Sequence, residues 1–308
     1  MLRYLSIRVA LGLVAVLGVT MITFVGERTA GSPVYLMVAP TSTQADIETM
    51  RHKLGLDRPL VVQYGIFLRN AAQGDFGTSL KVGVPATQLV RERVGATVEL
   101  AGAAFLLSLL VGVSLGVVAA TFRGTIVDRT ASIVGLVGQA MPGFWVGIML
   151  ILIFAVKLRW APVAGRGGIS HLVLPAVTLS WFSTAAFLRL TRSAMLDVLE
   201  SDYVKLARLK GVPEWLVVCK HALRNTLVTV TTYAGLTIAT LLGGAVIVET
   251  IFAWPGIGFM LTSALYTHDY PVIQAGVVLT SVAFVVCSLV VDLLYGVLDP
   301  RIRHGAYR

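Results

Sequence analysis

Six long runs of mostly hydrophobic residues without Asp, Glu, Lys or Arg are candidate membrane spans in this 308-residue chain. Each has 18 to 27 residues, and about 20 helical residues cross the hydrocarbon core of a bilayer. Backbone groups in lipid must be satisfied within the segment, so the runs are predicted as helices. They cover residues 9–26, 100–122, 130–156, 167–188, 225–248 and 270–291. Because His171 and Pro175 stand near its start, the fourth helix is expected to begin near Leu172.

Composition agrees with a membrane protein, since 56% of residues are hydrophobic and only 13% are charged. Soluble domains have about 25% charged residues. The net charge of +9 does not indicate nucleic-acid binding, because no basic stripe interleaves with aromatic residues. No His/Cys cluster has metal-ligand spacing, so no metal site is expected.

The distribution of Lys and Arg predicts the orientation. With a cytoplasmic N-terminus, 14 of them fall in inner segments and three in the two short outer loops. The other eight lie in residues 27–98, a segment long enough to cross largely regardless of charge. Both termini and the segment 193–224 are therefore expected inside the cell. The first run is expected to be an uncleaved anchor, because it exceeds the usual signal-peptide core and lacks a small-residue cleavage site.

The long outer segment is expected to form a compact helical cap of about 70 residues. Thr43 is suited to begin a helix that Gly55 ends, and Pro59 suits the first turn of a second helix. Pro85 is expected to open a third helix that leads into the second span. Two roles remain open: the cap contacts a partner or shields the pathway mouth, or it is a passive covering. The predicted domains are residues 1–96, the first span with this cap, and residues 97–308.

Small residues and one proline mark the spans. Gly112 and Gly116, like Gly143 and Gly147, have the spacing that permits close helix contact. Pro142 is expected to bend or break the third span. Broken helices often line transport pathways, but a purely structural kink is an equal reading.

Residues 193–224 form a polar insert with nine charged side chains between two uncharged runs. The pattern predicts a continuation of the fourth span through residues 194–209, a stop at Gly211 and a second helix from Pro213. The apolar face of the second helix is assigned to Trp215, Leu216, Val218 and Cys219. Charged residues are expected to face the cytosol.

Several stretches together resemble the inner-membrane permease subunits of binding-protein-dependent ABC transporters, within them the dipeptide and oligopeptide importers. They are LGLDRPLVVQYGIFLRNAAQGDFGTSL (54–80), ATVELA (96–101), DYVKLARLKGVPEWLVVCKHALRNTL (202–227), LLGGAVIVETIFAWPGIG (241–258) and DPRIR (299–303). In that family the insert carries the EAA loop, which docks into a groove on an ATPase subunit. Its Glu-Ala-Ala positions fall here on Lys205, Leu206 and Ala207, so only the last alanine and Gly211 persist.

The resemblance implies an all-α protein of six transmembrane helices, with both termini cytoplasmic, in the inner or plasma membrane. It implies a second, homologous permease subunit, ABC ATPase subunits and an extracytoplasmic substrate-binding protein as partners. No cofactor is expected on this chain, with ATP and Mg on the partner subunits. The residues assigned to ATPase coupling are Asp202, Tyr203, Lys205, Ala207, Arg208, Lys210, Gly211, Val212, Pro213 and Glu214.

Candidates for the pathway or its gate are chosen from polarity and position: Gln139, Met141, Pro142, Ser180, Thr237, Glu249 and Gln274. An acidic group at membrane depth, such as Glu249, is a functional candidate by default. The alternative, that it braces the turn which follows, is favoured. No Gly-x4-Gly-Lys-[Ser/Thr] motif and no catalytic triad or carboxylate pair stands out, so the chain is not expected to be an enzyme.

Two other classes remain. A secondary transporter or channel predicts an intramembrane charge relay and internal repeats, of which the sequence shows neither. A membrane scaffold that moves no solute is weakly disfavoured by the Pro142 kink. The substrate implied by the resemblance is a di- or oligopeptide, with a nickel chelate or glutathione as alternatives.

Overall fold

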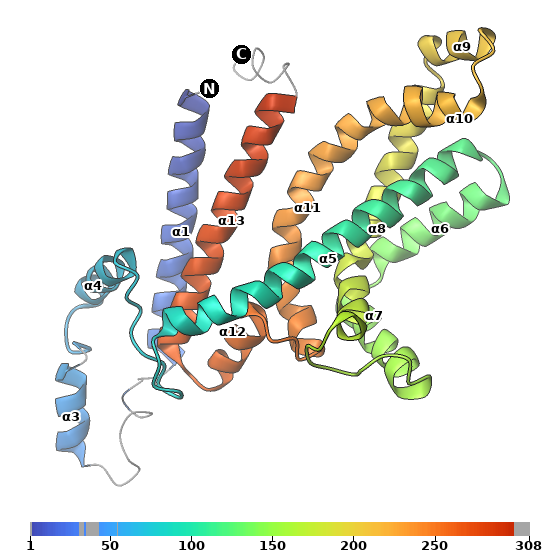
Figure 1. The fold of residues 1–308 in the computed structure, drawn as a ribbon. Coiled ribbons are helices and arrows are strands. Elements are labelled where there is room, and N and C mark those ends of the chain that lie inside the picture. The colour runs from blue at the N-terminus through green and yellow to red at the C-terminus, as the bar shows by residue number, and fades with distance from the viewer. Residues whose placement is uncertain (1, 31–33, 35–42, 54, 299–308) are drawn as a thin grey trace. The chain divides into compact units, whose positions relative to one another are not determined.

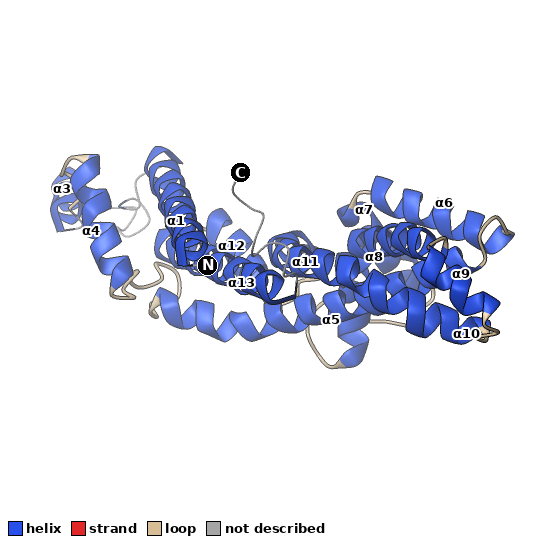
Figure 2. Ribbon diagram, turned by 90° about the horizontal axis from the view of Figure 1, so that it is seen from above, coloured by secondary structure: helices blue, strands red, loops and turns tan. Residues whose placement is uncertain are grey.

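The computed structural model describes residues 2–30, 34, 43–53 and 55–298. Every regular element in this part of the chain is a helix (Figure 2), so the predicted all-α class is confirmed. In chain order they are α1 (Leu2–Ala30), α3 (Gln44–Lys53), α4 (Leu60–Ala72), α5 (Ala86–Thr121), α6 (Ile126–Ala140), α7 (Gly143–Leu150), the π-helix η1 (Ile151–Lys157), α8 (Ile169–Leu199), α9 (Asp202–Leu209), α10 (Glu214–Leu216), the π-helix η2 (Val217–Ala222), α11 (Leu223–Ile251), α12 (Ile257–Tyr266) and α13 (Tyr270–Leu298).

Five helices within the described residues are long and apolar enough to cross a membrane. They lie in α1, α5, α8, the stretch from α10 through α11, and α13. The predicted third span is a broken pair of helices, and the chain direction bends by 105° between α6 and α7–η1. Pro142 stands at the break with φ −62° and ψ 131°, outside the helical region. The bend expected at Pro142 is confirmed, while the count of six spans stays a prediction that treats this pair as one.

The chain divides into two compact units. The first comprises Met1–Gly95 and Gly256–Leu289, and the second comprises Ala96–Pro255 and Val290–Arg308. The division into domains 1–96 and 97–308 remains a prediction.

In the first unit, the predicted start and stop signals of α3 are confirmed. The backbone N–H and hydroxyl of Thr43 donate to Asp46 Oδ2, at 2.9 and 2.8 Å. Gly55 has φ +64°, and the N–H of Leu56 donates to the Arg51 carbonyl oxygen at 3.0 Å. This left-handed turn satisfies carbonyls that the helix end leaves open. Pro59 directly precedes α4; the role of these helices as an outer cap stays a prediction.

The first unit is held together by aromatic and apolar contacts. Phe24 of α1 lies 5.4 Å from Tyr64 and 5.7 Å from Phe67 of α4, between ring centroids. A second cluster joins Phe76 and Val90 to α12 and α13. Helix α12 was not predicted, since the glycine-rich segment before it was expected to be a turn.

Side-chain hydrogen bonds fix the turn between α12 and α13. Asp269 is buried and accepts a hydrogen bond from the Ser79 hydroxyl (2.5 Å) and one from the Leu80 N–H (3.0 Å). The segment between α4 and α5 is therefore tied to the start of α13 within this unit. The ribbon of Figure 1 shows α1 beside α13, where a Cβ on Gly12 would meet Val285.

In the second unit, α5 packs directly on α8. A Cβ added to Gly112 would lie 2.7 Å from the Thr184 carbonyl oxygen, and one on Gly116 would lie 2.7 Å from that of Leu188. The close contact expected for this pair is confirmed. In the second pair only one glycine makes a close helix contact: Gly147 faces Thr178, whereas a Cβ on Gly143 would have nothing within 4 Å.

Helix α8 differs from expectation at both ends. It begins at Ile169, three residues before Leu172. It ends at Leu199 and does not continue through residues 194–209. Ser201 adopts an extended conformation (φ −69°, ψ 152°), so a separate helix, α9, starts at Asp202. Pro175 lies inside the first turns of α8 without breaking it.

Candidate functional site

The polar insert folds as two short helices joined by a tight turn. Helix α9 ends at Leu209, and Gly211 takes φ +76°. The N–H of Gly211 donates to the Arg208 carbonyl oxygen (3.0 Å) and that of Val212 to Ala207 (3.2 Å). These two bonds are the pattern that ends a helix on a left-handed residue. Glycine adopts this conformation without steric cost, so the sequence-predicted role of Gly211 as the stop is confirmed.

One face of the two helices is buried against the ends of the long spans. Val204 and Val217 are fully buried, and they pack with Met195 of α8 and Ala120 of α5. The apolar positions of α9 and η2 therefore anchor the insert to the helices that precede it. An apolar inward face was expected, but its members differ: Val217 belongs to it, whereas Trp215 and Cys219 are exposed.

An ion pair closes the turn from outside. Arg208 Nε and Nη2 donate to the two carboxylate oxygens of Glu214, at 3.1 and 2.6 Å. Two parallel bonds between planar groups fix geometry as well as charge. Both side chains are about half exposed, so the pair contributes roughly 0–1 kcal/mol. Its effect is to hold α9 and α10 at one spacing across Pro213.

The other coupling candidates lie on the same two helices. Lys205 Nζ lies 3.2 Å from Asp202 Oδ1, one turn away. The Tyr203 hydroxyl accepts a hydrogen bond from the Asn225 amide (2.5 Å) and donates to the His221 carbonyl oxygen (3.3 Å). Lys210 is exposed beside the turn. The structure thus brings all ten candidate residues into one small surface element.

Three large apolar side chains on this element face outward. Leu206 is 56% exposed, Leu209 83% and Trp215 67%. They flank the turn at Gly211, on α9 and α10. Trp215 was assigned to the inward apolar face of the second helix, and this assignment is wrong. The helix register decides it, because Val217 and Val218 take the inward positions.

Two ion pairs that were not predicted tie the spans together near the insert. Arg192 of α8 donates from Nε and Nη2 to the buried carboxylate of Asp128 on α6, at 2.5 and 2.9 Å. Asp128 also accepts the N–H of Gly124. Arg123 pairs with Glu200, which directly follows α8. The sequence does contain a signal for these pairs, since opposite charges stand at the ends of successive spans, but the signal was not used.

The pathway candidates of the broken span lie at its bend. Pro142 and Met141 form the break between α6 and α7. Gln139, in the last turn of α6, accepts a hydrogen bond from Arg189 of α8. The bend is therefore connected to α8 through this polar contact.

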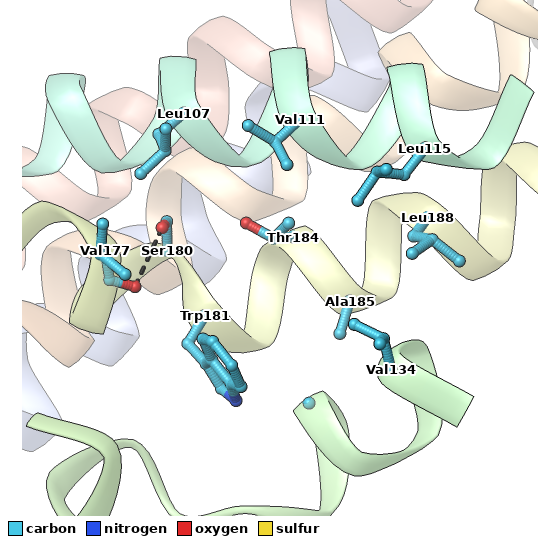
Figure 3. Close-up of a pocket in the computed structure, with 11 residues that line it drawn as sticks. Leu107, Val111, Leu115, Val134, Val177, Ser180, Trp181, Thr184, Ala185 and Leu188 are labelled. Carbon is cyan, nitrogen blue, oxygen red and sulfur yellow. Dashed lines mark hydrogen bonds between the residues drawn. The ribbon is translucent and has the colours of Figure 1, made fainter. Parts of the chain in front are cut away.

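Ser180 and Thr237 are buried, and their hydroxyl groups bond to their own helices. Ser180 donates to the Val177 carbonyl oxygen (3.1 Å), and Thr237 to that of Tyr233 (2.9 Å). Ser180 lines a cavity of about 230 Å³ between α5, α6 and α8. Figure 3 shows leucine and valine side chains of α5 along one wall and Trp181 of α8 opposite Val134 of α6. This cavity is lined almost entirely by apolar groups.

Glu249 is fully buried near the end of α11. Its Oε1 accepts a hydrogen bond from the Thr97 hydroxyl at 2.7 Å, which joins α11 to α5. Five residues later, Trp254 is also fully buried, and its indole N–H donates to the Ala96 carbonyl oxygen at 2.8 Å. Both bonds end within the ATVELA stretch. The Glu249 side chain thus joins α11 to α5, and its bracing of the turn that follows stays a prediction.

The last candidate, Gln274, lies on α13 in the first unit. Its amide donates to Glu27 Oε2 of α1 at 2.5 Å. Ser180, Thr237 and Glu249 belong to the second unit, as does the bend at Pro142. The pathway role of all seven residues stays a prediction.

Comparison with known protein families gives two matches that together cover most of the sequence. Residues 112–304 match the model of the binding-protein-dependent transport system inner membrane component. Residues 1–101 match the model of the N-terminal part of such membrane components. The chain belongs to this family. It is therefore a multi-pass inner-membrane protein and a transport permease subunit, as the resemblance implied.

Individual relatives match along nearly their whole length. The chain is 40% identical to the di/tripeptide transport system permease protein DppB of Pseudomonas aeruginosa, over 99% of both sequences. It is 39% identical to the oligopeptide transport system permease protein AppB of Bacillus subtilis, over 99% of this chain and all of the relative. Among solved structures, an inward-facing MetNI methionine ABC transporter aligns with a TM-score of 0.59. That match covers 69% of this chain and 97% of the other at 19% identity, so it shows the shared fold alone.

Proposed function

We propose that this chain is a permease subunit of an ATP-driven importer of di- or oligopeptides. It forms half of the translocation pathway beside a second, homologous permease subunit. An extracytoplasmic binding protein delivers the peptide to it. The full-length similarity to peptide permeases supports this substrate class. Nickel chelates and glutathione remain alternative solutes of the same transporter class.

ATP and Mg act on partner ATPase subunits, and this chain supplies no catalytic group or cofactor. It receives their motion through α9 and α10 at the cytoplasmic surface. The observation that carries this proposal is the exposed apolar group of Leu206, Leu209 and Trp215. These side chains surround a turn held by an ion pair and by a buried core. Large apolar groups gathered on a surface element mark a contact with another protein.

Rigidity of this element is what allows it to transmit force. Shifting a two-state equilibrium from 1:99 to 99:1 takes about 5.5 kcal/mol. A loose loop would absorb the displacement of a docked partner. The buried Val204 and Val217 instead connect the docked helices to α5 and α8. The Asp128–Arg192 pair then connects α8 to α6. Movement of the partner is therefore passed to the spans.

The test is the substitution Trp215→Ala in the complex with its ATPases. An exposed aromatic anchor at an interface contributes about 2 kcal/mol or more, roughly a thirtyfold change in affinity. We expect ATPase subunits to co-purify poorly with Trp215→Ala, while the amount of permease in the membrane stays the same. The matched control is Trp160→Ala, because Trp160 is also strongly exposed (73%) but precedes α8. Equal ATPase recovery with both variants contradicts the docking role.

A further inference from the structure

The first unit contains a cavity of about 320 Å³ with mixed polar and aromatic walls. It lies between α1, α4, the segment after α4, and α13. Its lining includes Phe24, Phe67 and Phe76 together with Arg28, Asn70 and Asp75. Binding pockets for small molecules have volumes of about 300–1,000 Å³ and combine apolar walls with a few polar groups. This cavity is at the lower end of that range.

The cation in the cavity wall, Arg28, is held in place and has hydrogen-bond donors that a ligand can use. The guanidinium of Arg28 lies 4.7 Å from the ring centroid of Phe24, and its Nε donates to Gln63 Oε1 at 3.1 Å. Gln63 is buried and is itself fixed by donating to the Arg58 carbonyl oxygen at 2.7 Å. This arrangement leaves the terminal N–H groups of Arg28 without a hydrogen bond to the described residues. A fixed guanidinium matches a carboxylate or phosphate with two parallel bonds.

An anion lies in the same wall. Asp75 Oδ1 accepts the N–H of Gly77 at 2.9 Å, which leaves Oδ2 without a hydrogen bond to the described residues. The Asn70 amide beside it also lines the cavity. Arg28 and Asp75 do not pair with each other within the described part of the chain. The cavity therefore presents a cation and an anion that are both open to a ligand.

A buried carboxylate lies next to the wall. Glu27 is only 5% exposed, and Gln274, which lines the cavity, donates to its Oε2 at 2.5 Å. Its Oε1 has no hydrogen-bond partner among the described residues. This bond holds the Gln274 amide in place, so Gln274 adds a fixed polar group to the cavity wall.

We propose that this cavity binds a small zwitterion and that its ligand is a free short peptide. The peptide carboxylate binds Arg28, and its ammonium group binds Asp75 with help from Asn70. Phe67 and Phe76 contact the peptide side chains. The peptide assignment rests on the proposed function; the zwitterion chemistry rests on the cavity alone. The chain then holds its own peptide site, separate from that of any binding protein.

The test uses the permease–ATPase complex without its binding protein, in nanodiscs of phosphatidylcholine and phosphatidylglycerol. Binding of radiolabelled alanyl-phenylalanine is measured at equilibrium. We expect saturable binding that Arg28→Gln and Asp75→Asn each weaken at least about tenfold, since each removes a charge-assisted contact. The control is Arg69→Gln on α4, an exposed residue that does not line the cavity, and it should bind as the unaltered complex does.

A second measurement uses only the unaltered complex, so its result does not depend on whether the variants fold. A photoreactive alanyl-phenylalanine should label residues 24–28 or 63–77 in the unaltered complex. Amidated alanyl-phenylalanine, which lacks the carboxylate, should compete with this labelling at least about tenfold more weakly than the free dipeptide does. Labelling elsewhere, or unchanged binding to Arg28→Gln, overturns the site. Glycerophosphoethanolamine, a lipid headgroup with the same two charges, is the other source of this chemistry. If it displaces the peptide at lower concentration than unlabelled peptide does, a lipid is the ligand. Peptide uptake by the full transport system bears on the proposed function alone.

Discussion

Two glycines in α5 decide how closely this helix approaches α8. The carbonyl oxygens of Thr184 and Leu188 occupy the space that side chains at Gly112 and Gly116 would need. Without a hydrophobic force between helices in lipid, such close packing is a main source of association. The Cβ atoms of Phe187 and Thr191 lie equally close, and no side-chain rotation moves a Cβ atom or a carbonyl oxygen, so an added methyl group cannot be relieved in that way.

We expect Gly116→Ala to loosen this contact at a cost of about 1–3 kcal/mol, the usual range for an overpacked interior. The midpoint of thermal unfolding, measured by circular dichroism in one detergent, should fall. Gly102→Ala is the matched control, because Gly102 lies on the same helix with nothing within 4 Å. A similar midpoint for both variants contradicts the proposed importance of the contact.

The sequence could not separate the two glycine pairs. Gly112 and Gly116 have the same spacing as Gly143 and Gly147, but only the first pair meets a partner helix at both positions. Which residues face a neighbour depends on helix rotation, and rotation depends on the remaining spans. Glu249 shows the same limit. The sequence could not identify its partner, because Thr97, which donates to it, lies 152 residues away in the chain.

At the scale of elements, turns were predicted well where glycine carries them and poorly elsewhere. Gly55 and Gly211 both end helices with positive φ, as expected. Ala253 and His268 adopt the same left-handed conformation after α11 and α12. Neither residue type signals such a turn, because L-residues with a Cβ seldom adopt it. The ends of α11 and α12 therefore carried no such signal, while α12 itself was missed because the glycine-rich segment before it was expected to be a turn. The break at Ser201 (φ −69°, ψ 152°) was missed because the fourth span was expected to continue through residues 194–209.

The turn at Gly211 yields a prediction about coupling. Proline fixes φ near −65°, whereas Gly211 has φ +76°, and proline also removes the N–H that donates to Arg208. We expect Gly211→Pro to change the spacing of α9 and α10, so that ATP hydrolysis continues while peptide uptake falls at least about tenfold. The measurement is peptide taken up per ATP hydrolysed in proteoliposomes. Gly211→Asn, which tolerates positive φ, should keep most of the uptake, and normal uptake by Gly211→Pro would disprove the role of the turn.

At the scale of the whole molecule, hydrophobic runs predicted the long helices because lipid imposes one length and one backbone solution on every span. The bend at Pro142 was predictable from the missing N–H, but its angle of 105° was not. That angle depends on how α6 and α7 each pack on α8. The orientation across the membrane was predicted from the charges of the loops, and the arrangement of the helices does not determine it.

The orientation can be tested with the chain's own cysteines. Cys219 is exposed beside α10, and Cys287 lies partly buried on α13. If the cytoplasmic surface carries the insert, a membrane-impermeant maleimide should label Cys219 in inside-out vesicles and fail to do so in right-side-out vesicles. Val82 is 61% exposed in the segment between α4 and α5. In a background with both cysteines replaced by serine, Val82→Cys should give the opposite pattern. Labelling of Cys219 from outside would place the insert beyond reach of cytoplasmic ATPases, and the coupling mechanism would fail with it.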